Sequence, residues 1–137
     1  GIGAAICREL ARLGYSVVVH YRTSSEEAKA VVQSCRQLGA QAISIRGNFS
    51  SQEGVEQFAE EVLESAPEIG GLVNGVGPYL RRSLLETGAE EVADLFQTNL
   101  YAPMELIRLF SGLLIAERGR VVQLGLAGLS PFRDDRR

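Results

Sequence analysis

Short apolar segments alternate with longer amphipathic ones along most of this chain, and this alternation limits the possible folds more than any other feature. The short segments are rich in valine and isoleucine and lie at 17–20, 42–45, 72–73 and 121–124. Such nearly continuous apolar runs are typical of strands that are buried on both faces. Apolar residues at helical spacing mark the longer segments, at about 25–38, 51–63 and 89–117, and we expect the last to bend near Pro103.

Strands that alternate with helices in this way pair in parallel, and the helices cover both faces of the sheet. Connections between parallel strands are right-handed. The sequence therefore predicts an α/β protein with a Rossmann-like, doubly wound parallel sheet in three α/β/α layers. No repeat, low-complexity tract or linker interrupts the pattern, so we expect residues 1–137 to form a single domain. A hydrophobic content of 45% is enough for a core.

The beginning of the chain departs from this pattern. Gly1-Ile2-Gly3 leads directly into a helical segment, whereas a fold of this kind opens with a strand that feeds such a turn. We therefore expect a partial domain without its first strand, and one interpretation is an incomplete gene product with no independent role. Without that strand the sheet would expose a long apolar edge or lose its centre, which predicts poor solubility.

Charge and composition exclude several classes of partner. The net charge of −3 offers no attractive field for nucleic acid or an anionic membrane surface. The apolar runs are too short to span a bilayer, and no signal peptide is visible. Cys7 and Cys35 lie in helical segments without metal-ligand spacing, so we expect two reduced thiols, a cytoplasmic protein and no metal site.

In a doubly wound sheet, ligands bind at the carboxyl ends of the strands and at the turns that lead into helices. Gly1, Ile2 and Gly3 form the first such turn. Glycines let the backbone approach a phosphate, and the following helix offers free N–H groups and a partial positive charge. A tight entry into a helix explains the same residues without a ligand.

The second candidate segment follows the first predicted strand and consists of Tyr21, Arg22, Thr23 and Ser24. Sites for NAD usually have an acidic residue here, which binds the ribose hydroxyls. None is present, and Arg22 can instead face a 2′-phosphate, with the two hydroxyls as further donors. The alternative is a solvated arginine on a loop. His20 is better explained as a strand-end residue than as a catalytic base.

Two further candidate segments follow the next strands. Asn48 and Phe49 could border an adenine ring, although a plain strand-to-helix turn explains them almost as well. Asn74, Gly75, Val76 and Gly77 form a loop whose backbone can lie against a ribose or a nicotinamide.

The fifth candidate is a polar residue inside the long helical segment. Asn99 has mostly apolar neighbours, so its amide either points to solvent or enters the site as a hydrogen-bonding group. Helical periodicity does not distinguish between these two orientations.

The order and spacing of these motifs resemble the short-chain dehydrogenase/reductase family over essentially the whole chain. Residues 1–3 are similar to the end of its T-G-x-x-x-G-x-G fingerprint, and residues 74–77 to a variant of its N-N-A-G motif. Residues 98–103 resemble its N-x-x-x-P segment, and residues 119–124 the strand before its catalytic serine. Residues 20–24 make the chain look most similar to 3-oxoacyl-carrier-protein reductases and pteridine reductases.

This resemblance implies an oxidoreductase that uses NADP(H) and transfers hydride to a carbonyl or similar small-molecule substrate. The four candidate segments would hold the cofactor, and Asn99 would join the family's proton relay as a catalytic residue. The resemblance also implies that the parent protein is a homodimer or homotetramer assembled through long helices. Leu106, Phe110 and Leu113 could serve such an interface, or equally the core.

Three departures from the family's pattern limit these implications. Asn48 stands where the family commonly has an aspartate, and Leu126 stands where it has the catalytic serine. Ser130 is a possible substitute for that serine. No tyrosine in the chain is followed four residues later by lysine, as the family's Y-x-x-x-K motif requires. We therefore expect this chain alone to be inactive, and a non-catalytic nucleotide-binding or scaffold protein of the same fold is the alternative.

Overall fold

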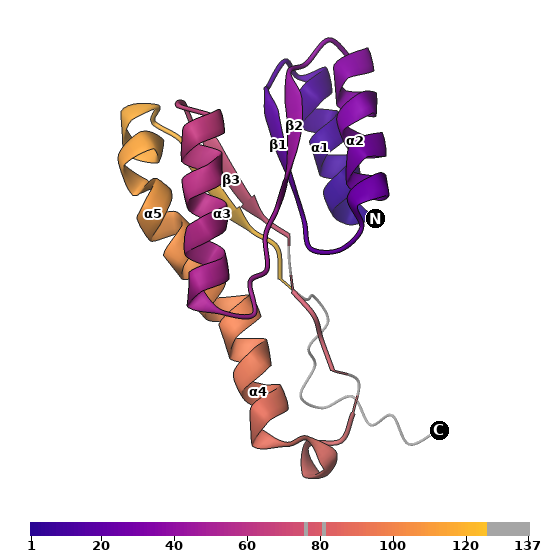
Figure 1. The fold of residues 1–137 in the computed structure, drawn as a ribbon, viewed down its shortest axis with the longest axis vertical. Helices are drawn as coiled ribbons and strands as arrows, with labels where there is room; N and C mark the ends of the chain where they lie inside the picture. Colours follow the sequence, from indigo (N-terminus) through magenta and orange to yellow (C-terminus); the bar gives the residue numbers. More distant parts are fainter. Residues whose placement is uncertain (76, 81, 126–137) are drawn as a thin grey trace.

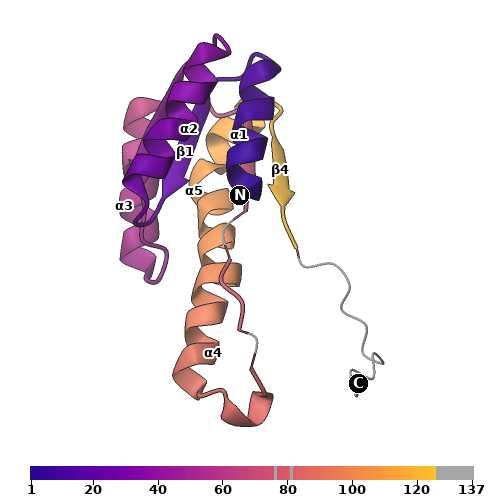
Figure 2. The same ribbon diagram turned by 90° about the vertical axis from the view of Figure 1, so that its right-hand side faces the viewer.

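The computed structural model describes residues 1–75, 77–80 and 82–125 (Figures 1 and 2). Four strands are present: β1 (Val17–Tyr21), β2 (Ala42–Arg46), β3 (Gly71–Asn74) and β4 (Arg120–Gln123). The helices are α1 (Ile2–Arg12), α2 (Ser25–Gln37), α3 (Gln52–Ser65), η1 (Leu84–Glu86), α4 (Ala89–Phe96), η2 (Gln97–Tyr101) and α5 (Ala102–Ala116). The alternation of strands and helices confirms the predicted α/β class.

The strands form two separate parallel pairs. β1 pairs with β2 from Val17↔Ala42 to Tyr21↔Arg46, and β3 pairs with β4 from Gly71↔Arg120. The sequence predicts a parallel sheet that lacks its first strand and would expose an edge or lose its centre. In the structure, hydrogen bonding between the described strands does not cross from β1 to β3. Figure 1 shows the two pairs next to each other, with α1 and α2 beside the first and α3 and α5 beside the second.

Two apolar clusters hold the helices against the strands. Alternate residues of β1, Val17 and Val19, pack with α1 and α2. On the opposite face, Val18 packs against a cluster built mainly from α3 and α5. Leu72 of β3 contacts the same cluster, so one layer of helices supports both strand pairs.

Local signals in the sequence explain where the helices begin and end. Gly14 and Gly39 follow α1 and α2 with φ angles of 91° and 89°, a left-handed conformation that glycine adopts without strain. Ser51 caps α3, because its hydroxyl accepts a hydrogen bond from the Gly54 amide at 3.2 Å. Ser24 occupies the N-cap of α2, but its hydroxyl makes no capping bond.

The long helical segment predicted at 89–117 is interrupted. It consists of α4, the π-helical turn η2 and α5, and Pro103 lies in the first turn of α5. Proline has no amide hydrogen, so it cannot donate to the carbonyl of Asn99 four residues earlier. The irregularity therefore lies just before Pro103, where the sequence suggested a bend.

The apolar residues of α5 that could serve either a subunit interface or the core are buried to different degrees. Leu106 and Phe110 are only 3% and 2% exposed and belong to the α3–α5 cluster, and Leu113 is partly buried. In this structure Leu106 and Phe110 serve the core.

The strand predicted at 121–124 begins one residue earlier, at Arg120.

Candidate functional site

The carboxyl ends of β1 and β2 lie side by side, because these strands are parallel and in register up to Tyr21 and Arg46. Three hydrogen bonds join the residues that follow. The Gly47 amide donates to the Tyr21 carbonyl at 2.9 Å, and Arg46 Nε donates to the Arg22 carbonyl at 3.2 Å. His20 Nε2 lies 2.9 Å from the Gly47 carbonyl, which makes it the donor. The predicted segments 21–24 and 48–49 are therefore neighbours.

Arg22, Thr23 and Ser24 are all exposed in the turn that leads into α2. None of the ion pairs among the described residues involves Arg22. The turn has no acidic residue, and the Ser24 hydroxyl is not used to cap the helix. A cation, two hydroxyls and the positive end of a 13-residue helix thus face solvent together, a combination suited to a phosphate.

Asn48 and Phe49 have different surroundings. The Oδ1 atom of Asn48 accepts hydrogen bonds from the amide of Ser50 at 3.3 Å and from its hydroxyl at 2.8 Å. Phe49 is only 6% exposed, and its ring stacks on His20 with 4.2 Å between the ring centroids. The Asn48 side chain is therefore at the surface, and the Phe49 ring is part of the core.

His20 is held in an apolar setting at the end of β1. Besides the stacked Phe49 ring, the edge of Phe58 approaches it with a centroid separation of 5.1 Å. Burial lowers the pKa of His20, and the hydrogen bond to Gly47 opposes this effect only in part. A neutral imidazole that supports a turn fits these contacts, in agreement with its interpretation as a strand-end residue.

The loop after β3 approaches the π-helical turn η2. Asn99 is exposed, and its Nδ2 donates to the Pro78 carbonyl at 3.0 Å, so its side chain contacts the loop. A Cβ at Gly77 would meet the Asn99 side-chain amide, whose end would have to shift to make room. Val76 lies outside the described residues.

Asn74 ends β3 and is only 6% exposed. Its backbone carbonyl accepts a hydrogen bond from the Leu124 amide at 2.9 Å. Its side-chain Nδ2 is buried without a partner among the described residues. A buried donor of this kind destabilises the fold unless an acceptor reaches it.

The first helix begins at the same end of the molecule where β1 finishes, because α1 runs antiparallel to β1 after a short turn (Figure 2). Gly1 and Gly3 are exposed, and a side chain at either would meet no atom within 4 Å. Ile2 is 73% exposed. The open backbone at the start of α1 is therefore accessible to an anion.

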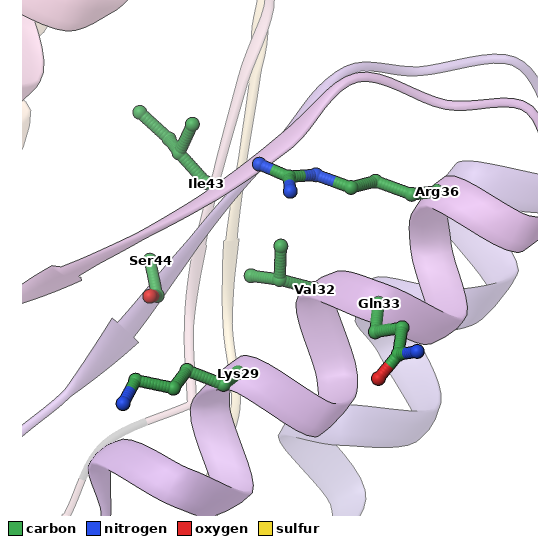
Figure 3. Close-up of a pocket in the computed structure, with 6 residues that line it drawn as sticks. All are labelled: Lys29, Val32, Gln33, Arg36, Ile43 and Ser44. Carbon is green, nitrogen blue, oxygen red and sulfur yellow. The ribbon is translucent and has the colours of Figure 1, made fainter.

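A shallow hollow of about 590 Å³ lies elsewhere, between α2 and the outer side of β2 (Figure 3). It is lined by Lys29, Val32, Gln33, Arg36, Ile43 and Ser44. Both of its cations already have partners. Lys29 pairs with Glu26 at 2.6 Å, and Arg36 donates to the Ala42 carbonyl at 2.8 and 3.0 Å. The turns at the strand ends are the better candidate site, because their polar groups remain available.

Other kinds of site find little support in the described part of the chain. No group of three or more His, Cys, Asp or Glu side chains there could hold a metal ion. None of the described helices is both long and apolar enough to cross a membrane. Cys7 and Cys35 are unpaired thiols, and burial raises the pKa of Cys7. Leu126 and Ser130, at and near the position of the family's catalytic serine, lie outside the described residues.

Sequence reasoning missed one residue at this site, Arg46. Its position at the exposed end of β2, directly after the buried Ile45, gives no signal of its own in the sequence. Only the pairing register with β1 places this arginine beside the turn that contains Arg22.

Comparison with known proteins adds evidence that is independent of this geometry. A family model described as short chain dehydrogenase matches residues 1–132. A 3-oxoacyl-[acyl-carrier-protein] reductase from Staphylococcus epidermidis is 29% identical over 125 residues, which cover 90% of this chain and 51% of the relative. The chain thus spans about half the length of the curated relatives it matches.

Two solved structures have the same fold. A metagenomic short-chain oxidoreductase in complex with NADP superposes with a TM-score of 0.85 at 34% identity, covering 96% of this chain and 60% of the other. A dehydrogenase/reductase from Sinorhizobium meliloti gives 0.87 at 35%, covering 96% and 53%. The parallel strands, the glycine turn before α1 and a family match over residues 1–132 agree with one another, and the chain belongs to the short-chain dehydrogenase family.

Proposed function

We propose that this chain binds NADP(H) across the carboxyl ends of its strands, as the cofactor-binding part of a reductase that transfers hydride to a carbonyl or similar small-molecule substrate. The observation that supports this most directly is the turn after β1. Arg22 is exposed there without a carboxylate partner among the described residues, beside Thr23, Ser24 and the N-terminus of α2. A cation in place of an acidic residue favours a 2′-phosphate over free ribose hydroxyls.

Each part of the proposed site fits one part of the cofactor. The open backbone of residues 1–3 at the start of α1 would bind the pyrophosphate. Arg22, Thr23 and Ser24 would hold the 2′-phosphate, and Tyr21, Asn48 and the backbone at Phe49 would border the adenosine. The loop of residues 74–77 would lie along the nicotinamide half.

When bound, NADPH supplies the hydride, and the protein supplies binding and orientation. Asn99 would then act by holding the loop after β3, through its hydrogen bond to the Pro78 carbonyl. Gly77 allows the close approach of that loop to Asn99. The geometry of the nicotinamide half therefore depends on the π-helical turn that presents Asn99.

Binding without catalysis is the alternative function, and one specific feature favours it. Leu126 stands where the family has a serine, and a leucine cannot donate a hydrogen bond to a substrate carbonyl. The chain also contains no Tyr-x-x-x-Lys motif. Under either function we expect these 137 residues alone to bind the cofactor without turning it over.

Calorimetric titration of the chain with NADPH and with NADH tests the proposed cofactor. We expect NADPH to bind about tenfold or more tightly, because a charge-assisted contact to the extra phosphate contributes on the order of 1.5–3 kcal/mol. Arg22→Gln should remove most of this preference. Arg108→Gln, which removes an equal charge from the exposed side of α5, should leave it unchanged. Equal affinity for both nucleotides in the unsubstituted chain would refute NADP(H) as the cofactor.

Activity is tested separately, with NADPH oxidation followed over a broad panel of ketones and aldehydes. We expect no turnover by this chain under conditions in which NADPH binding is saturated. Turnover by the chain would show that a residue other than the family's serine, tyrosine and lysine supports proton transfer.

A further inference from the structure

We propose that Arg46 is a second cation for the 2′-phosphate and helps to determine the preference of this chain for NADP(H) over NAD(H). The proposal rests on the proposed function, and it adds to the site a residue from a different strand. Arg22 and Arg46 would then bind the phosphate from β1 and β2 respectively.

The pairing of the strands fixes where Arg46 lies. It is the register partner of Tyr21, and in parallel strands such partners point to the same face. On that face Val17, Val19 and Ala42 pack against α1 and α2. Arg46 is therefore at the carboxyl end of β2, on the side of the sheet where α2 begins.

A hydrogen bond then holds the guanidinium against the turn. Arg46 Nε donates to the Arg22 carbonyl at 3.2 Å, within the segment that carries the Thr23 and Ser24 hydroxyls. A guanidinium has five N–H donors, and this bond uses one of them. Among the described residues no acceptor is bonded to Nη1 or Nη2 of Arg46, so its forked end is available to an oxyanion.

The charges of the turn favour the same conclusion. Among the described residues neither Arg22 nor Arg46 pairs with a carboxylate, as is also true of Arg8, Arg36, Arg118 and Arg120. The N-terminus of α2 adds its own partial positive charge. The guanidinium of Arg46 and the N-terminus of α2 attract a dianion such as a phosphate monoester more strongly than a neutral hydroxyl, and Glu26 and Glu27 in the first turn of α2 oppose this attraction in part.

A purely structural role for Arg46 makes a different prediction. If Arg46 only tied the end of β2 to the turn, its loss would weaken every adenosine ligand by a similar factor. A phosphate contact would be lost only by ligands that have a 2′-phosphate. The ratio of two affinities therefore separates the two roles.

The experiment measures binding of adenosine 2′,5′-bisphosphate and of adenosine 5′-monophosphate by calorimetry, since these probes differ only in the 2′-phosphate. The full chain is compared with Arg46→Gln, Arg46→Lys and Arg108→Gln. We expect Arg46→Gln to reduce the preference for the bisphosphate about tenfold. Arg46→Lys should retain part of the preference, because the charge stays while the fork is lost. Arg108→Gln should retain all of it.

Two results would overturn the proposal, and they are distinguishable. If Arg46→Gln weakens both probes equally and keeps their ratio, Arg46 is structural, and the proposed NADP(H) site stands without it. If the unsubstituted chain shows no preference for the bisphosphate, the proposed cofactor and this inference fail together. A reduced ratio in Arg46→Gln with an unchanged ratio in Arg108→Gln supports the proposal.

Discussion

The two strand pairs have the same parallel pairing but very different surroundings. The β1–β2 pair is covered on one face by α1 and α2 and on the other by α3 and α5. In the β3–β4 pair, Leu72 reaches the α3–α5 cluster, but every residue of β4 is exposed, including Val121 at 42% and Val122 at 47%. Valine-rich sequence thus predicts a strand equally well in both places. Whether that strand is buried depends on elements that are distant in the sequence.

The two strand pairs should differ most in how much stability they lose when a glycine in or next to each pair is replaced by alanine. A Cβ at Gly47 would lie 2.8 Å from Phe49, 2.9 Å from Phe58 and 3.0 Å from His20, all within a packed aromatic cluster. We expect Gly47→Ala to reduce the free energy of unfolding by about 3 kcal/mol. Gly71→Ala in β3 is the matched control, since its Cβ would make only an ordinary contact at 3.6 Å. Urea denaturation measures both, and an equal loss would contradict the comparison.

Shortening one valine in each pair tests the same contrast by removing atoms. Val19 of β1 is 6% exposed, whereas Val122 of β4 is 47% exposed. We expect Val19→Ala to lower the free energy of unfolding by about 2 kcal/mol, and Val122→Ala by no more than about 0.5 kcal/mol. A loss above about 1 kcal/mol in Val122→Ala would mean that the exposed face of β4 is covered in solution.

Asn48, which follows β2, and Asn74, which ends β3, should differ less in their effect on the free energy of unfolding. Asn48 accepts two hydrogen bonds from Ser50, so Asn48→Ala should cost about 1 kcal/mol. Asn74 has a buried Nδ2 with no partner among the described residues, so Asn74→Ala should leave the free energy of unfolding nearly unchanged. If Asn74→Ala costs more than Asn48→Ala in the same denaturation series, an acceptor reaches Asn74 in solution.

The smallest expected effect is a dependence on pH that only the first pair should show. Burial lowers the pKa of His20 in the folded chain below its ordinary value of 6.5. As the pH falls below 6.5, the unfolded chain binds a proton that the folded chain resists, so the free energy of unfolding decreases. His20→Phe should remove this decrease without altering the acid response of the carboxylates. If the free energy of unfolding varies with pH in the same way in the unsubstituted chain and in His20→Phe, folding does not lower the pKa of His20.

The sequence predicts the local structure well and the tertiary arrangement less completely. Both strands of the first pair, and the glycines that end α1 and α2, follow from apolar runs and left-handed turns that depend on near neighbours only. The missing strand before residues 1–3 already suggested a sheet that loses its centre, and the two separate strand pairs agree with this. Which strands pair does not follow from near neighbours, because pairing depends on residues far apart in the chain. The π-helical turn before Pro103 was foreseen only as a bend, since proline disturbs a helix without specifying how its backbone adjusts.

In the candidate site too, some features could be predicted from the sequence and others depend on the tertiary structure. The cation at Arg22 and the absence of an acidic residue are visible in the sequence, and the structure leaves both in an exposed turn. The buried ring of Phe49 and the position of Arg46 are not visible, because the first depends on stacking with His20 and the second on strand register. The sequence left Asn99 pointing either to solvent or into the site. In the structure it is exposed and bonds the Pro78 carbonyl, a contact that depends on a loop distant in the sequence.

Among the described strands no backbone hydrogen bond joins β1 to β3, and this has a consequence for how the chain fluctuates. The β3–β4 pair can open without breaking the backbone ladder of β1–β2, so amide hydrogen exchange should divide the chain into two cooperative units. Amide hydrogens of β1 and β2 should exchange only through global unfolding. Those of β3 and β4 should exchange through a local opening that leaves the first unit folded.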